Sequence, residues 1–291
     1  MGRCIYAAGD DGKVLQALSC TQTVSLVELG SWSPQSVLDT VAKAKDGRRP
    51  KYHALIDSGA LVTGMTNSEV ATYLLQSGLE GLDGVLFLNE RNERVVLERD
   101  GKIVELAQCG LSPEKRFSFY DHVHTTGMDL KQPLLCTAAL TLSKDMTLRD
   151  YAQGAYRMRG IGRGQRIELL VTPEVRALMN KSLSQVEQTS EEARAASLQA
   201  LRRKPEAFLQ ATLVDALCWL VLNGLNAEEP GSGSCCGSKT STTFGAPRPV
   251  VAWRSGPRTW RFGLARRAPK SPWPSWWCRW TSASRTSGPA K

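Results

Sequence analysis

Five short and almost unbroken apolar runs constrain the fold of this 291-residue chain most strongly. They are YHALID from residue 52, GVLFLN from 84, FSFY from 117, AALTL from 138 and RIELLV from 166. Such runs are typical of strands that are buried on both faces of a parallel sheet. Stretches with helical spacing of apolar residues alternate with them. The pattern therefore predicts an α/β fold with a mostly parallel sheet.

Local signals place several helices and turns. Ser33 and Pro34 form a helix start, and Asn67 caps a second helix that Gly78 ends. Three strands, GVLFLN, RVVLER and KIVELA, follow one another, and the last two are separated by the turn residues Asp100 and Gly101. A hairpin is expected near Asp11-Gly12 at the start of the chain.

Composition divides the chain into four parts. We expect an N-terminal appendage (1–49), the α/β lobe (50–180), a helical extension (181–229) and a disordered basic tail (230–291). Residues 231–291 hold eleven Lys and Arg and no Asp or Glu, which leaves 26 basic and 28 acidic residues in the rest of the chain. The tail therefore accounts for the formal net charge of +9. A protein that grips nucleic acid usually carries its basic patch on the fold, so nucleic acid stays open as a partner.

The cysteines predict an intracellular protein, cytoplasmic or nuclear. The eight are scattered, without a C-x-x-C pair or zinc-finger spacing, so we expect reduced thiols and no metal site. The N-terminus lacks the apolar segment of a signal peptide. The most apolar run, residues 211–225, is too short to span a bilayer, so no membrane association is expected.

Two further stretches contain residue types that bind phosphate. In YAQGAYRMRGIGRGQ (151–165), a helix capped by Thr147 is expected to end at Gly160. Three arginines there alternate with glycines, an arrangement that suits bidentate phosphate contacts. The second stretch, HTTGMDLK (124–131), places a Thr/Gly/Asp turn directly after the run FSFY. A solvated basic face beside a Gly-rich turn is the alternative explanation of the arginines.

The order of these stretches resembles the second RecA-like lobe of superfamily 2 helicases and of the bacterial preprotein translocase ATPase. That lobe has a G-x-D motif followed by a Q-x-x-R-G-R-x-G-R motif. The resemblance implies that nucleotide is bound by Thr126, Gly127, Asp129 and Gln153. It also implies that one of Arg157, Arg159 and Arg163 is an arginine finger. The chain has no P-loop and no D-E-x-[DH] motif. Because of this, no cofactor is expected on the chain alone, and ATP with Mg²⁺ would need a partner lobe from a longer chain.

Residues 52–179 also resemble the C-terminal region of very large eukaryotic proteins that are labelled ubiquitinyl hydrolase or ubiquitin thioesterase. The resemblance is carried by ALIDSGALVTGMTNSEVA, QCGLSPEKRFSFYDHVHTTGMD and KDMTLRDYAQGAYRMRGIGRGQ. It implies a link to deubiquitination, with ubiquitin or a ubiquitinated protein as partner. The D-G-x-C motif of ovarian-tumour-type thioesterases does not occur, so no catalytic residue is transferred with the label.

Two protease interpretations remain as alternatives. In a thiol deubiquitinase, Cys109 would be the nucleophile, His122 or His124 the base, and Asp121 the residue that orients it. In a retroviral-type aspartic protease, LIDSGA would supply Asp57, which would pair with its copy in a second subunit.

Strand order and helical spacing each allow one geometric prediction about the phosphate-binding residues. Parallel strands would bring 124–129 and 157–163 together at the carboxyl ends of the strands, where open α/β sheets bind ligands. Arg157 falls four residues after Gln153 on the polar face of the expected helix. We therefore expect its side chain to be exposed and its removal to cost little stability.

Overall fold

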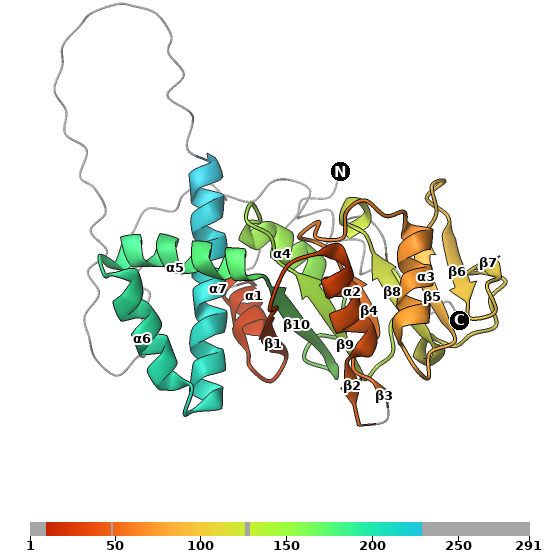
Figure 1. Ribbon diagram of the computed structural model, residues 1–291, viewed down its shortest axis with the longest axis horizontal. Coiled ribbons are helices and arrows are strands. Elements are labelled where there is room, and N and C mark those ends of the chain that lie inside the picture. Colours follow the sequence, from red (N-terminus) through yellow and green to blue (C-terminus); the bar gives the residue numbers. More distant parts are fainter. Residues whose placement is uncertain (1–9, 48, 126–128, 229–291) are drawn as a thin grey trace, which may run out of the picture. The chain divides into compact units, whose positions relative to one another are not determined.

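The computed structural model describes residues 10–47, 49–125 and 129–228. From Asp11 onward they belong to one compact unit, Asp11–Glu229, built on an eight-stranded sheet (Figure 1). The strands lie side by side in the order β1-β10-β9-β4-β8-β5-β6-β7. Their bounds are β1 (Val24–Glu28), β10 (Gln165–Val171), β9 (Cys136–Thr141), β4 (Ala54–Ile56), β8 (Arg116–Tyr120), β5 (Gly84–Leu88), β6 (Arg94–Glu98) and β7 (Ile103–Glu105).

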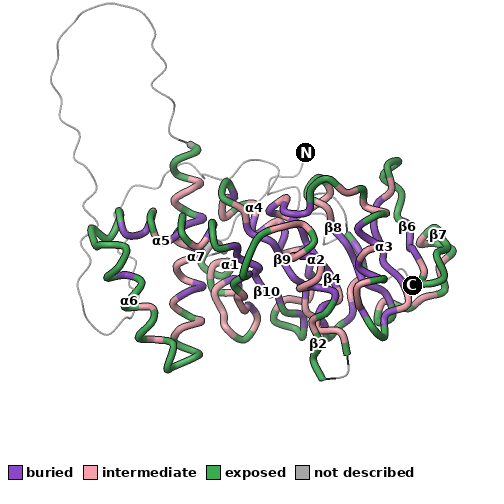
Figure 2. Tube along the Cα trace, viewed as in Figure 1, coloured by how far each residue is buried: buried purple, intermediate pink, exposed green. Residues whose placement is uncertain are grey.

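The sheet confirms the predicted α/β class. The strands from β1 to β5 in this spatial order are parallel to one another, and β6 and β7 add an antiparallel hairpin at one edge. All five apolar runs form parallel strands. The side chains of β5 and β8 are buried throughout, which explains why those runs show no polar alternation. Figure 2 shows this burial along the central strands.

Helices cover both faces of the sheet. The α-helices are α1 (Asp10–Ser19), α2 (Pro34–Lys43), α3 (Asn67–Ser77), α4 (Leu148–Ala155), α5 (Pro173–Glu187), α6 (Glu191–Leu201) and α7 (Pro205–Glu228). Short 3₁₀ turns, η1 (Pro113–Lys115) and η2 (His122–Thr125), flank β8, and β2 (Lys45–Asp46) pairs with β3 (Arg49–Pro50) in a small separate hairpin.

The direction of each crossover decides which face its helix covers. The units β1-α2-β4 and β4-α3-β5 move one way along the sheet, and β9-α4-β10 moves the opposite way. Right-handed crossovers then place α2 and α3 on one face and α4 on the other. Accordingly, α2 and α3 share a core cluster with Leu55, Phe117 and Leu170. On the opposite face, the Tyr151 hydroxyl of α4 donates to the carbonyl of Leu18 in α1.

The start of the chain differs from the prediction. Residues from Asp10 form helix α1 instead of a hairpin, and the stretch CIYAA lies outside the described residues. The strand β1 was not predicted, and it pairs with β10 along its whole length. Because β1 and α2 belong to the main sheet and core, the predicted appendage 1–49 is not separate from the lobe that was expected to begin at residue 50.

Two helix boundaries also differ. Thr66, not Asn67, is the cap of α3, and it forms a capping box with Glu69. Helix α4 ends at Ala155, five residues before Gly160, because the chain turns at Tyr156. The capping of α4 by Thr147 with Asp150 is as predicted.

The C-terminal extension is helical, as predicted, and the predicted tail 230–291 lies outside the described residues. Helix α6 is largely exposed, as expected for its charged sequence. Helix α7 is longer than the predicted run, and Pro205–Ala227 is long and apolar enough to cross a membrane by length and composition alone. It also packs against α4, α5 and β1, where Leu213, Trp219 and Leu220 are buried, although only 33% of its most apolar window is buried.

A buried carboxylate joins β1, β10 and the segment before β4. Glu168, which is 4% exposed, accepts hydrogen bonds from Ser25 (2.9 Å) and from the hydroxyl of Tyr52, and it forms an ion pair with Lys51 (2.6 Å). Burial alone would raise the pKa of Glu168, but the hydrogen bonds from Lys51, Tyr52 and Ser25 hold it below the ordinary value. The ionised form is therefore the form that the fold stabilises.

This network predicts a specific acid sensitivity. Because the folded-state pKa of Glu168 is lowered, its contribution is present above the unfolded pKa of about 4.5 and is lost as the pH falls through the folded value. In Glu168→Gln, unfolding free energies measured by urea titration should be lower than wild type at pH 7, and the difference should shrink below pH of about 4.5. A constant difference across that range would show that Glu168 acts by packing alone.

Candidate functional site

The two predicted phosphate-binding stretches contact each other through an ion pair. Arg159 Nε lies 3.2 Å from Asp129 Oδ1, so the segment after η2 and the turn after α4 meet as predicted. Thr126 and Gly127 fall outside the described residues. Both partners are partly exposed, and such a pair contributes little to stability by itself. The pair shows that the Gly/Arg turn (residues 156–164) lies against the segment that begins at Asp129.

Arg157 is buried, which contradicts the predicted exposed position. Its side chain is 2% exposed, and its Nε donates to the carbonyl of Gln153 (3.4 Å). Burial and the positive charge of Arg159 lower the pKa of Arg157, while interactions with Tyr120 and Asp129 oppose that shift. The helical projection failed because α4 ends at Ala155.

Arg163 is exposed, like Arg159, but it is not part of an ion pair with a described residue. Gly162 and Gly164 flank it with positive φ, which glycine adopts without the steric cost that other residues meet. Its side chain is exposed and has no partner among the described residues. It precedes the first residue of β10, so it lies at the amino edge of the sheet. The prediction that 157–163 lies entirely at the carboxyl edge is therefore wrong for this end of the stretch.

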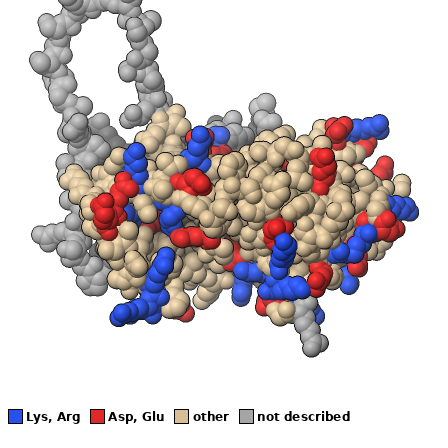
Figure 3. All heavy atoms as spheres, viewed as in Figure 1, with Lys and Arg blue, Asp and Glu red and all other residues tan. Residues whose placement is uncertain are grey.

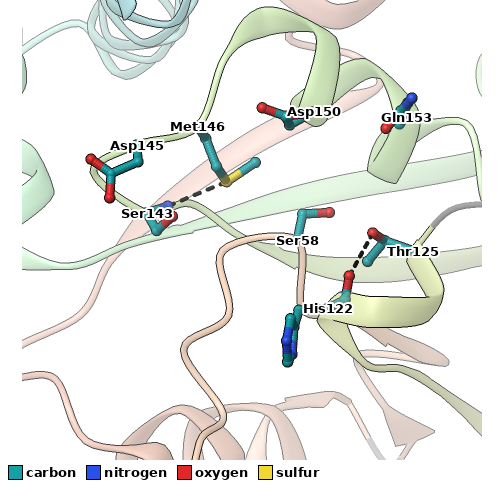
Figure 4. A pocket seen from close by; sticks show the side chains of 8 residues that line it. All are labelled: Ser58, His122, Thr125, Ser143, Asp145, Met146, Asp150 and Gln153. Atoms are coloured by element: carbon teal, nitrogen blue, oxygen red, sulfur yellow. Dashed lines mark hydrogen bonds between the residues drawn. The ribbon is translucent and has the colours of Figure 1, made fainter.

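Gln153 instead lines an open pocket at the carboxyl edge (Figure 4). The pocket has a volume of about 370 Å³, within the usual range for small-molecule sites. Its wall is formed by loops after β4, β8 and β9 and by α4, with the lining residues Ser58, His122, Thr125, Ser143, Asp145, Met146, Asp150 and Gln153. At about 3.3 Å per residue, the length of β9 separates this pocket from the Arg163 end of the turn by about 17 Å.

The position of the pocket follows from the topology. Strands β4 and β9 are neighbours, but the chain leaves β4 toward α3 on one face and leaves β9 toward α4 on the other. Diverging loops at such a switch point create the crevice in which open α/β sheets bind ligands. Gly154 lets α4 approach the β4 loop closely, since a Cβ at this position would overlap the hydroxyl of Ser58.

Asp57 has a structural role in the β4 loop. It is 1% exposed, and its two oxygens accept hydrogen bonds from Leu61 N (2.9 Å), Val62 N (3.0 Å) and Thr141 Oγ1 (2.7 Å). Burial raises the pKa of Asp57, and these hydrogen bonds oppose the shift. A carboxylate enclosed at the end of a parallel strand cannot face its copy in a second subunit. This geometry does not support the aspartic protease alternative.

The thiol dyad is not assembled either. The Cys109 thiol lies 3.8 Å from Glu98. Glu98 pairs with Gly84, the first residue of β5, so Cys109 is near the amino end of the parallel strands. His122 and His124 follow the opposite, carboxyl end of β8, about 13 Å away at 3.3 Å per residue. His124 contacts Asp121 (2.8 Å) and Asn92 (2.7 Å) as a loop-bracing residue.

The pocket was not predicted, apart from Gln153 and His122. Ser58, Ser143, Asp145 and Met146 follow two apolar strands directly, and that position was the available sequence signal. In the described part of the chain, no three His, Cys, Asp or Glu side chains gather as a metal site. Figure 3 shows acidic and basic side chains interspersed on the face in view.

The comparisons with known proteins do not identify the chain. No family model matches it, and neither a curated protein nor a solved structure is significantly similar to it.

Proposed function

We propose that residues 11–229 act as the second, RecA-like lobe of a larger nucleotide hydrolase in a ubiquitin-linked protein. The observation that carries the proposal is the contact between Arg159 and Asp129. It joins the stretch that resembles the G-x-D motif of the helicase lobe to the stretch that resembles its Q-x-x-R-G-R-x-G-R motif, and the two residues lie thirty positions apart in the chain. A solvated basic face would not require such a contact.

The three arginines would then have different roles. Arg157 is buried beside Tyr120 and supports the turn, and Arg159 is held by Asp129. Arg163 is exposed on a glycine-flanked turn, so its guanidinium can reach a phosphate that another surface presents. We therefore assign the arginine-finger role to Arg163. The charge it supplies would stabilise the developing negative charge on the transferred phosphoryl group.

The rest of the nucleotide site would come from the partner lobe. The sequence has no P-loop to hold the phosphates and no D-E-x-[DH] motif for Mg²⁺. ATP and Mg²⁺ would bind that lobe, and the present chain would complete the site when the two lobes close. Ubiquitin or a ubiquitinated protein is the proposed target of the whole assembly, on the basis of the family resemblance alone.

Deleting the lobe tests whether ATP hydrolysis needs both this chain and the partner lobe. The full-length protein should hydrolyse ATP, and the same protein without residues 11–229 should lose that activity, measured as phosphate release. The isolated chain should release phosphate no faster than a buffer blank. Undiminished hydrolysis after the deletion would contradict the proposal, and hydrolysis by the isolated chain would contradict the need for a partner lobe.

The same preparations test the thiol alternative. The isolated chain should not cleave a ubiquitin–fluorophore conjugate, because Cys109 and the histidines lie at opposite ends of β8. Turnover that disappears in Cys109→Ala would instead favour an autonomous deubiquitinase.

A further inference from the structure

We propose that the pocket at the carboxyl ends of β4, β8 and β9 binds the vicinal diol of a sugar ring, either in a free glycoside or in the ribose of a nucleoside. The proposal does not rest on the nucleotide-lobe function, because none of the three arginines lines this pocket. It rests on the charge of the wall, on its unpaired polar groups and on how firmly the wall is held.

The charge of the wall disfavours an anionic group. None of the described lining residues is Lys or Arg, whereas two carboxylates, those of Asp145 and Asp150, line the pocket. Asp150 Oδ2 is occupied as the acceptor of the α4 capping box. Asp145 is exposed and has no partner among the described residues. Asp150 Oδ1 has Arg149 Nε 4.0 Å away, but the carboxylate of Asp145 has no such cation among the described residues, so a phosphate entering the pocket would meet its negative charge.

The unpaired polar groups include both donors and acceptors. The side chains of Ser143 and Gln153, like the carboxylate of Asp145, make no hydrogen bond to the described residues. The Ser58 hydroxyl oxygen is buried without a partner and lies in the middle of the lining residues in Figure 4. Rotation about its Cα–Cβ bond would turn the hydroxyl into the pocket and remove the cost of leaving it unpaired.

A diol matches this set because each hydroxyl both donates and accepts. Adjacent hydroxyls can donate to the two oxygens of one carboxylate and accept from an amide or a serine. An ammonium group has donors only, so it would leave the Gln153 amide and the serine hydroxyls without an acceptor. The His122 imidazole points away from the Ser58 hydroxyl in Figure 4, so the pocket has no assembled Ser/His dyad that would act on the sugar.

The wall is held in place before a ligand arrives. Met146 is buried, and its sulfur accepts from Ser143 N (3.3 Å), which closes the turn after β9. From α7, the Asn223 amide donates to the carbonyls of Lys144 (3.2 Å) and Met146 (2.9 Å). A preformed loop avoids the ordering cost that weakens the binding of small polar ligands.

An amide NMR titration of the full chain tests the proposal with four probes. Methyl β-ribofuranoside and adenosine carry the diol, 2′,3′-dideoxyadenosine lacks it, and inorganic phosphate tests the anion. We expect the diols to shift the amide signals of Ser58 and of residues 143–153 with a Kd of about 1–10 mM. Binding by the riboside identifies free sugars as a source, and binding by adenosine but not dideoxyadenosine identifies nucleosides.

Asp145→Asn should weaken diol binding about 5- to 10-fold, because a charge-assisted acceptor becomes a neutral amide. Asp145 is exposed, so the variant should melt like wild type. Asp46→Asn, in the β2–β3 hairpin, is the matched control and should bind normally. Three results would each overturn the proposal: no shifts at about 20 mM diol, dideoxyadenosine binding as tightly as adenosine, or phosphate binding more tightly than the diols.

Discussion

Replacing Arg163 with alanine is expected to slow ATP hydrolysis by the assembled full-length protein by a factor on the order of 10³. Arg163 is the member of the arginine set that is exposed and has no partner in the described part of the chain. Its loss would remove charge stabilisation from the transition state and leave ATP binding by the partner lobe intact. The measurement is kcat and KM from steady-state phosphate release, with kcat carrying the loss.

Two variants separate this role from a general effect of charge. Arg163→Lys should remain slow, because a lysine ammonium cannot make the planar, bidentate contact of a guanidinium. Arg203→Ala removes another exposed arginine, in the turn between α6 and α7, and should hydrolyse ATP at the wild-type rate. If Arg163→Ala kept the wild-type kcat, Arg163 would not be a finger and the turn would be an ordinary solvated surface.

The sheet could be predicted because its strands carry their own signal. Every residue of RFSFY and GVLFL is buried, and only a strand covered on both faces requires such a run. The edge strand β1 carries no such signal, since VSLVE mixes polar and apolar residues and is mostly half-buried. In α1, Asp11-Gly12 resembles a turn, but Leu18 is fully buried, and packing of this kind overrides weak local preference.

The site was less predictable because it depends on contacts between distant segments. The pocket forms only where Ser58, His122 and Ser143 meet at three strand ends, and the local sequence marks Ser58 and Ser143 only by their position just after an apolar strand. The link between Asp129 and Arg159 followed from strand order, which the sequence does indicate. The position of Arg163 could not be predicted from strand order. The nine residues from Tyr156 to Gly164 run from the end of α4 to the start of β10, so Arg163 lies at the amino edge of the sheet.

The buried position of Arg157 reverses the expected effect of its removal. Arg157→Ala should lower the free energy of unfolding by about 3 kcal/mol, since it leaves a cavity where a long, buried side chain packed. The expected fall in Tm for a unit of this size is roughly 6–12 °C, measured by thermal melting of the isolated chain.

Arg149→Ala is the matched control, because Arg149 lies on the same helix with its side chain about half exposed. It should change stability by less than about 0.5 kcal/mol. Arg157→Met retains an unbranched apolar stem and should recover part of the loss if packing dominates. A Tm for Arg157→Ala that equals the wild-type value would mean that the Arg157 side chain is not packed in solution. Arg157 would then be an exposed arginine that can contact a phosphate.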